Sequence, residues 1–242
     1  MLTISKSQDS FLKAIADGAN LAVISVGYRL SPEHSYPKPV HDCFDAAEWL
    51  VDNGQAHFGA GLKFIGGDVS KPQHEACPLL TLVQSAGGHL SLLTVYHLLK
   101  AKPSFRFAGI VLHYGAYDLS FLPAARNFSK PLILDMTVMQ HFCDAFLPGT
   151  TPDQRKDPAI SPLYQDLTGM NLPPALFTCG TEDCLLDDTV MMAVKYQMSG
   201  AETVVKIIPG APHGYIIFPM DQVASAKEGL EATREFLMAK LE

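Results

Sequence analysis

The chain alternates short, almost continuously apolar runs with longer stretches in which apolar residues recur every three or four positions. The first pattern is typical of strands buried on both faces of a parallel sheet, and the second is typical of amphipathic helices. We therefore predict strands at residues 21–26, 62–65, 107–113, 175–179 and 204–208. Helices are predicted at residues 10–16, 40–51, 86–99, 188–198 and 223–241.

Strands separated by helices predict an α/β fold, in which helices cover both faces of a mostly parallel sheet. No internal repeat or low-complexity tract divides the chain, and 242 residues are enough for one hydrophobic core. We expect a single domain over residues 1–242.

Residues 119–162 interrupt this alternation. They contain an apolar run with methionines at 133–146 and a proline-rich stretch at 148–162. A long surface connection is one interpretation, and a lid over a substrate pocket is the other. Loops of this length in compact domains are usually functional or disordered, and methionine suits an adaptable apolar wall. We predict a lid at about 119–162.

The composition and net charge of the chain exclude some kinds of binding partner. Hydrophobic residues make up 48% of the chain and charged residues 18%, as in a soluble globular protein. A net charge of -7 argues against a nucleic-acid surface, and no apolar stretch approaches membrane-spanning length. We predict neither a nucleic-acid partner nor a membrane span, and the sequence leaves the oligomeric state open.

The five cysteines are odd in number and lack paired spacing, so they do not indicate a disulfide framework. A reducing compartment is the simpler interpretation, which predicts a cytoplasmic protein. No phosphate-binding or dinucleotide fingerprint occurs, and no cofactor is expected. His74, Glu75 and Cys77 imitate a metal cluster, but their spacing matches no usual site, and no metal is predicted.

The halves of a serine motif stand on either side of residues 69–84. Gly66-Gly67-Asp68 follows a predicted strand, and Ser85-Ala86-Gly87-Gly88 opens a predicted helix. Joined, they would spell the G-x-S-x-G nucleophile elbow, a strained turn whose flanking positions need almost no side chain. As the chain is written, the β-branched Val83 stands two residues before Ser85. Ser85 is thus a candidate nucleophile in an interrupted motif.

Residues 69–84 have two competing explanations. Their first and last codons permit intron donor and acceptor sequences, so an unspliced, in-frame intron would produce them. A genuine loop insertion is the alternative, since residues 79–83 are apolar enough to be the strand that leads into Ser85. We predict that residues 62–65 keep that strand position and that 69–84 form an insertion looped out of the sheet.

Two loops that follow predicted strands carry candidate partners for the serine. Asp183 comes after strand 175–179, and His213 comes after strand 204–208. One helix lies between the strands, so both loops emerge at the sheet edge where such folds place catalytic groups. Either residue alone has a plainer role, Asp183 as a helix cap and His213 in an ordinary turn. The chain order Ser85, Asp183, His213 is that of α/β-hydrolases and favours a catalytic triad.

These motifs resemble the hormone-sensitive-lipase-like branch of the α/β-hydrolases, which includes bacterial esterases and arylacetamide deacetylases. The resemblance covers nearly all of the chain except residues 69–84. It is carried by both halves of the serine motif and by Tyr28-Arg29-Leu30-Ser31-Pro32-Glu33-His34, Gly180-Thr181-Glu182-Asp183 and Pro212-His213-Gly214-Tyr215. It implies an α/β-hydrolase fold.

The resemblance also implies hydrolysis of carboxylic esters with short or medium acyl groups, so the expected partner is a small-molecule ester substrate. It implies Ser85 as nucleophile, His213 as general base and then acid, and Asp183 as the residue that orients the imidazole. Amide hydrolysis by the same fold and a catalytically inactive hydrolase-like protein are the alternatives.

One feature of that branch is missing. Its members carry a His-Gly-Gly-Gly segment upstream of the tyrosine–arginine motif, whose N–H groups form the oxyanion hole, and this chain has no such segment. We therefore expect that the fold is incomplete at the amino terminus. The N–H of Ala86 supplies one oxyanion-hole donor. Because a lost donor costs about 10²- to 10³-fold in turnover, we expect impaired activity.

Overall fold

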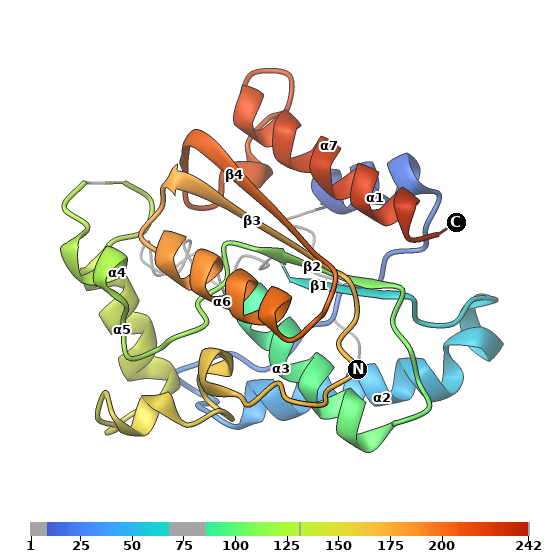
Figure 1. The fold of residues 1–242 in the computed structure, drawn as a ribbon, viewed down its shortest axis with the longest axis horizontal. Coiled ribbons are helices and arrows are strands. Elements are labelled where there is room, and N and C mark those ends of the chain that lie inside the picture. The colour runs from blue at the N-terminus through green and yellow to red at the C-terminus, as the bar shows by residue number, and fades with distance from the viewer. Residues whose placement is uncertain (1–8, 68–85, 131, 242) are drawn as a thin grey trace.

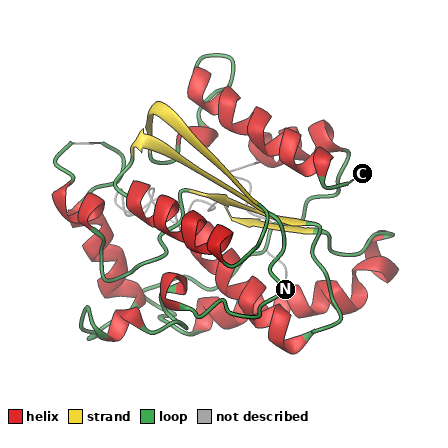
Figure 2. Cartoon of the chain, in the orientation of Figure 1, coloured by secondary structure: helices red, strands yellow, loops and turns green. Residues whose placement is uncertain are grey.

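The structure is a computed structural model that describes residues 9–67, 86–130 and 132–241. The described residues form a four-stranded parallel sheet at the centre of the molecule (Figures 1 and 2). The order across the sheet is β1 (Phe64–Gly67), β2 (Gly109–His113), β3 (Ala175–Glu182) and β4 (Thr203–Pro212). The sequential order follows from parallel strands joined by helical crossovers.

Helices cover both faces of the sheet (Figure 1). One face packs against α3 (Ala86–Ala101) and α6 (Leu186–Met198), with α2 (Lys38–Phe58) outside α3. The other face packs against α1 (Asp9–Ala19) and α7 (Ala224–Ala239). The predicted fold class is confirmed. None of these helices combines the length and the apolarity that crossing a bilayer requires, within the ranges the structure describes.

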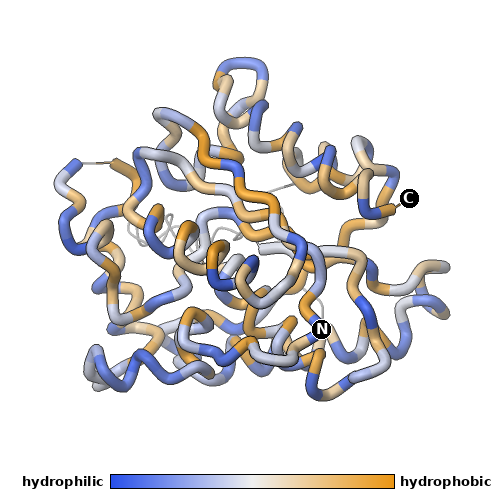
Figure 3. Tube along the Cα trace, in the orientation of Figure 1, coloured by the Kyte–Doolittle hydropathy of each residue, from blue (hydrophilic) through white to orange (hydrophobic). Residues whose placement is uncertain are grey.

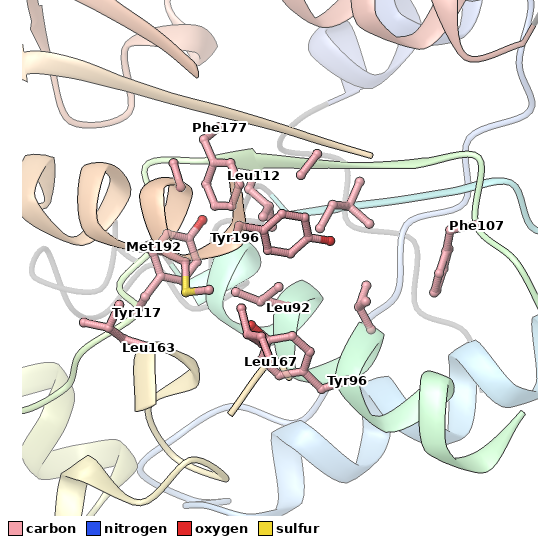
Figure 4. Close-up of a cluster of buried hydrophobic side chains, with 14 of the residues drawn as sticks. Leu92, Tyr96, Phe107, Leu112, Tyr117, Leu163, Leu167, Phe177, Met192 and Tyr196 are labelled. Carbon is pink, nitrogen blue, oxygen red and sulfur yellow. The ribbon is translucent and has the colours of Figure 1, made fainter. Parts of the chain in front are cut away.

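The strands are apolar on both faces because they lie between these helical layers. In β2, Ile110 and Leu112 pack with α3 and α6, whereas Val111 packs with α7. Burial on two sides explains why the strand sequences are continuously apolar instead of alternating. Phe177 and Tyr196 lie in the larger cluster (Figure 4), and the strand region is largely orange in the hydropathy colours of Figure 3.

The predicted strand at residues 21–26 is wrong. This run forms no strand with any described residue, and Val23 and Ile24 remain 38% and 36% exposed. The run lines a cavity together with β1, which is an edge strand of the described sheet. Neighbouring strands must lie about 4.8 Å apart to share hydrogen bonds. An apolar run separated from the edge by a cavity therefore has no ladder to join.

The other predicted strands and helices are present, and several run further than predicted. α2 continues to Phe58 and ends at Gly59, whose φ of 73° is the left-handed conformation that glycine favours. β3 and β4 run on to Glu182 and Pro212, which are partners in the ladder. Short 3₁₀ turns occur at η3 (Gln154–Lys156), η4 (Pro162–Tyr164) and η5 (Tyr215–Ile217).

Residues 119–162, called the lid segment from here on, form a helical layer without a strand among the described residues. It contains α4 (Pro123–Asn127) and α5 (Met136–Phe146), and the side chain of Asp135 caps α5. Its inner side chains join Cys184 and Leu185 in a separate buried cluster. They are Leu119, Phe121, Ala125, Leu134, Met139, Cys143, Leu147 and Ile160. The segment is thus a packed layer next to the end of β3, and its function as a lid stays a prediction.

Candidate active site

Asp183 and His213 meet where β3 and β4 end. Each follows its strand directly, because the paired residues Glu182 and Pro212 are the last of the two strands. Parallel strands present their carboxyl ends at the same edge of a sheet. Asp183 and His213, which follow the two strand ends, therefore lie close to each other. Oδ2 of Asp183 lies 2.9 Å from Nδ1 of His213.

A register shift between Gly180 and Glu182 lies just before this pair. The main chains approach so closely there that a side-chain carbon on Gly180 would lie 1.9 Å from the carbonyl oxygen of Ala211. Glycine is the residue that permits such an approach. Irregularities of this kind re-aim the side chains beside them, so the shift contributes to how Asp183 faces His213.

The pair is shielded from solvent, with 3% of Asp183 and 1% of His213 exposed. Oδ1 of Asp183 accepts the main-chain N–H of Leu185 at 2.9 Å, and Oδ2 accepts the N–H at Nδ1 of His213. With Nδ1 as the donor, Nε2 carries the lone pair that a general base needs. Nε2 is buried and has no hydrogen-bond partner among the described residues. The histidine is therefore oriented to accept a proton.

Two other carboxylates close by in the sequence have different partners. Oδ2 of Asp187 accepts an N–H at the start of α4 at 2.8 Å. Oδ1 of Asp188 accepts two main-chain N–H groups that follow β2, both at 2.7 Å. Burial raises the pKa of Asp188 well above its ordinary value, although these two N–H groups oppose the shift. Among these three aspartates, Asp183 is the one that contacts His213.

Tyr114 forms a wall beside the histidine. Its ring meets the ring of His213 edge-on, with centroids 4.8 Å apart. It has a φ of 35°, a left-handed conformation that is rare for tyrosine. Strained backbone of this kind clusters at functional sites. Sequence reasoning missed Tyr114, although its place directly after a buried strand, at the edge that carries Asp183, is a signal that could have found it.

The main chain at the end of β1 is in direct contact with the main chain at the start of α3. A side-chain carbon on Gly67 would lie 1.8 Å from the carbonyl carbon of Gly87 and 2.3 Å from the nitrogen of Gly88. Strand and helix pass at this distance only where side chains are absent. A nucleophile elbow requires the same close passage around its serine. Gly67 and Gly87 therefore meet even though residues 68–86 separate them in the sequence.

Ser85 lies outside the described residues, and so does its predicted contact with His213. The predicted insertion at 69–84, the rival strand at 79–83 and the cluster of His74, Glu75 and Cys77 also lie outside them. β1 overlaps the predicted strand at 62–65 and pairs with β2. Elsewhere, in the part of the chain that the structure describes, His, Cys, Asp and Glu side chains form no group that could hold a metal ion.

Ala86, the predicted oxyanion-hole residue, is the first residue of α3. The first four N–H groups of an α-helix have no acceptor within the helix, and the helix dipole adds partial positive charge there. The N–H of Ala86 is therefore suited to an anionic oxygen. It is a single main-chain donor contributed by the residue that follows Ser85 in the sequence.

Comparison with known proteins agrees with this architecture. A sequence profile of the alpha/beta hydrolase fold family matches residues 1–217. An ethyl acetate hydrolase from Pseudomonas putida is 27% identical over 236 residues, which cover 97% of this chain and 68% of the relative. Carboxylesterase NlhH from Mycobacterium tuberculosis is 30% identical over 239 residues, which cover 96% of this chain and 69% of the relative.

Among solved structures, an esterase from Pyrobaculum calidifontis is similar with a TM-score of 0.80 at 27% identity. The match covers 96% of this chain and 70% of that chain. The family profile, the relatives and the solved structure agree with the parallel sheet and its helical layers. The chain belongs to the α/β-hydrolase fold family.

Proposed function

We propose that this chain is a serine carboxylic-ester hydrolase of the hormone-sensitive-lipase-like branch. The observation that carries the proposal is the buried Asp183–His213 hydrogen bond, which leaves Nε2 of the histidine without a partner among the described residues. The close passage of Gly67 and Gly87 supports a nucleophile turn at the same edge of the sheet. Relatives named as an ethyl acetate hydrolase and a carboxylesterase support the reaction class.

Ser85 is the proposed nucleophile. His213 accepts the hydroxyl proton at Nε2 as Oγ attacks the ester carbonyl, while Asp183 holds the imidazole and stabilises its charged form. The imidazolium then gives that proton to the alcohol oxygen, which leaves. Water repeats the same steps on the acyl-enzyme and releases the carboxylic acid. The N–H of Ala86 donates to the oxyanion in both halves of the reaction.

Esters with short to medium acyl groups are the proposed substrates. The lid segment contributes apolar side chains, including Met139 and Leu147, to a cluster that also contains Cys184 and Leu185. The cluster includes the two residues that follow Asp183 in the sequence. Apolar surroundings suit an acyl chain better than a charged group. The missing His-Gly-Gly-Gly segment leaves one identified oxyanion donor, so the proposed activity is slow.

The test combines hydrolysis of p-nitrophenyl butyrate with covalent labelling by a fluorophosphonate probe. The probe should label the protein, and Ser85→Ala should abolish both labelling and hydrolysis. Ser91→Ala, which alters a serine on α3, should retain both. Labelling that persists in Ser85→Ala contradicts the nucleophile assignment. Absence of labelling in the unmodified protein favours the catalytically inactive alternative, and faster cleavage of butyryl p-nitroanilide than of the ester favours amide hydrolysis.

A further inference from the structure

The two ends of the lid segment, residues 117–119 and 161–164, lie side by side and are called the neck from here on. The N–H of Leu163 donates to the carbonyl oxygen of Tyr117 at 3.1 Å. The side chains of both residues belong to the buried cluster that contains Met192 of α6 (Figure 4). α6 also packs against η4 (Figure 1). The lid segment therefore begins and ends at one place, beside α6.

Side chains add further hydrogen bonds across the neck. Oγ of Ser161 accepts the N–H of Leu119 at 2.9 Å. Oδ2 of Asp118 accepts the hydroxyl of Tyr164 at 2.9 Å. Ser161 and Asp118 are both buried. Because buried hydrogen bonds open less readily than exposed ones, the two ends keep a fixed position relative to each other.

One buried carboxyl group joins the neck to α6. Asp188 is the third residue of α6, and its Oδ1 accepts the N–H groups of Tyr117 and Asp118, both at 2.7 Å. Asp188 stands five residues after Asp183, on the helix that follows the loop of the proposed acid. The position of the neck is therefore tied to the same stretch of chain that orients His213.

The second oxygen of this carboxyl group indicates its protonation state. Oδ2 of Asp188 is buried and has no hydrogen-bond partner among the described residues. An ionised oxygen without a partner is far less favourable in such surroundings than a neutral one. Burial raises the pKa of Asp188, and the carboxylates of Asp118 and Asp183 act in the same direction. Asp188 is thus a neutral acceptor that asparagine can imitate.

The neck positions the apolar inner side of the lid segment. Met139 and Leu147 lie in one buried cluster with Cys184 and Leu185, which stand between Asp183 and α6. A neck that moved away from α6 would carry this apolar wall away from the loop of the proposed acid. Each acyl methylene that is buried contributes about fourfold to binding. The position of the wall therefore affects longer acyl groups more than short ones.

We propose that Asp188 is a positioning residue for acyl-chain selectivity. It holds the neck against α6 and so keeps the apolar side of the lid segment beside the loop that carries Asp183. This inference rests on the proposed ester hydrolysis and adds to it the residue that sets the preference for longer acyl groups. Asp188 acts through the lid segment, because the hydrogen bonds of its carboxyl group to described residues go to the neck.

Three variants of the full chain test this role. Asp188→Ala removes the acceptor, whereas Asp188→Asn keeps a neutral acceptor of the same size. Thr189→Ala shortens the next buried side chain of α6, whose hydroxyl has no partner among the described residues, and controls for a cavity at this place. The constants kcat and KM are measured for p-nitrophenyl acetate and p-nitrophenyl hexanoate.

Asp188→Ala should lower the hexanoate-to-acetate ratio of kcat/KM by at least about fourfold, mainly through a higher KM for the hexanoate. Its kcat for the acetate should stay within about twofold, because the contact between Asp183 and His213 is not altered. Asp188→Asn and Thr189→Ala should keep the ratio within about twofold of that of the unmodified chain. General damage to the fold would instead slow both esters alike.

Hydrogen exchange tests the anchoring without any measurement of activity. The amides of Tyr117 and Asp118 should exchange at least about tenfold faster in Asp188→Ala, while those of β2 stay protected. They should remain slow in Asp188→Asn. If the unmodified chain hydrolyses neither ester, the proposed function is contradicted, and faster exchange in Asp188→Ala still supports the anchoring of the neck.

Four results would overturn the inference. The first is an unchanged ratio in folded, active Asp188→Ala, and the second is unchanged exchange of the two neck amides. The third is an altered ratio in folded Asp188→Asn. If Asp188→Ala does not fold, exchange of the unmodified chain in urea decides: the amides of Tyr117 and Asp118 should open together with those of α6. Earlier opening of the neck is the fourth contrary result.

Discussion

At the scale of single residues, one carboxylate holds His213 in place. Asp183 accepts from Nδ1 of the imidazole with one oxygen and from the N–H of Leu185 with the other. The second bond fixes the rotation of the carboxylate, which in turn sets the orientation of the ring. The role of Asp183 in the proposed reaction is therefore positional and electrostatic.

Replacing Asp183 with asparagine tests that role. The amide keeps the size of the side chain but loses the charge, and it can donate to Nδ1 and favour the wrong tautomer. We predict that Asp183→Asn slows fluorophosphonate labelling of Ser85 by about 10⁴-fold, while thermal unfolding changes little. Asp187→Asn alters a carboxylate that contacts α4 instead and should label at nearly the unmodified rate. Equal losses in both variants would contradict the orienting role.

His89 and His113 are buried histidines that the proposed reaction does not use. Burial lowers the pKa of each to about 4. Nε2 of His89 donates to the carbonyl oxygen of Ile160 at 2.6 Å, which ties α3 to the lid segment. Nδ1 of His113 lies 2.8 Å from Oγ1 of Thr178. Both imidazoles are therefore neutral in the folded protein near neutral pH.

These low pKa values predict loss of stability in mild acid. A histidine with a folded pKa below its unfolded value of about 6.5 stabilises the fold fully above that value, and the contribution is lost as the pH falls toward 4. When the pH falls from 7 to 5, protonation of His89 alone should lower the free energy of unfolding by about 2 kcal/mol. This corresponds to a fall of roughly 4–8 °C in Tm. Asp188 has the opposite effect: because its pKa is raised in the folded protein, its contribution to stability increases as the pH falls.

The variant His89→Asn isolates this contribution, because asparagine retains a donor for Ile160 but does not titrate. Asp188 is present in both proteins, so its effect cancels in the comparison. Tm measured at pH 7 and pH 5 should fall less in the variant, by about the amount given above. An identical fall in both proteins would contradict the low pKa of His89.

At the scale of elements, the passage of β1 beside α3 depends on the absence of side chains. In Gly67→Ala the new carbon would overlap the main chain of Gly87, which moves only if α3 moves. We predict destabilisation by roughly 1–3 kcal/mol in urea unfolding. Gly61→Ala meets nothing within 4 Å and should change stability by less than about 0.5 kcal/mol. Similar losses in both variants would contradict the contact with Gly87 as the cause.

The observed ends of helices and strands show how much of an element an apolar sequence pattern can predict. The start of α7 at Ala224 lies one residue from the predicted start, because its amphipathic repeat marks the helix along its whole length. β3 continues to Glu182 through the polar Thr181, where no apolar pattern remains. A hydrophobic pattern reports burial, whereas a strand is defined by its hydrogen bonds. The ladder beyond the buried core was therefore not predictable from the pattern.

At the scale of the whole molecule, turnover needs the nucleophile, the base and the oxyanion donors in one assembly. Deleting residues 69–84 joins Asp68 directly to Ser85. Because Gly67 already touches Gly87, we expect the elbow to close with little movement of β1 or α3. The deletion should therefore raise stability more than activity.

Full rescue should also need an upstream segment that carries His-Gly-Gly-Gly, because the oxyanion requires more than the single donor at Ala86. We predict that kcat/KM for p-nitrophenyl butyrate rises slightly on deletion and by orders of magnitude only when both changes are made. The comparison uses four proteins: the unmodified chain, the deletion variant, the chain with the added segment, and the chain with both changes. Their kcat/KM values separate the effect of the deletion from that of the added segment. Ordinary enzymatic rates in the unmodified chain, abolished by Ser85→Ala, would contradict impaired activity.

The sequence by itself determined the fold class and identified Asp183 and His213 as candidate partners, because hydrophobic periodicity encodes burial and strand ends mark one sheet edge. Tertiary structure alone decided that they meet at 2.9 Å, since that contact depends on the register of β3 against β4 and on the shift at Gly180. It also decided that residues 21–26 form no strand with the described residues and that β1 lies at one edge of the described sheet. The physical reason is that strand pairing depends on which main chain lies alongside, and a strand's own side chains do not specify it.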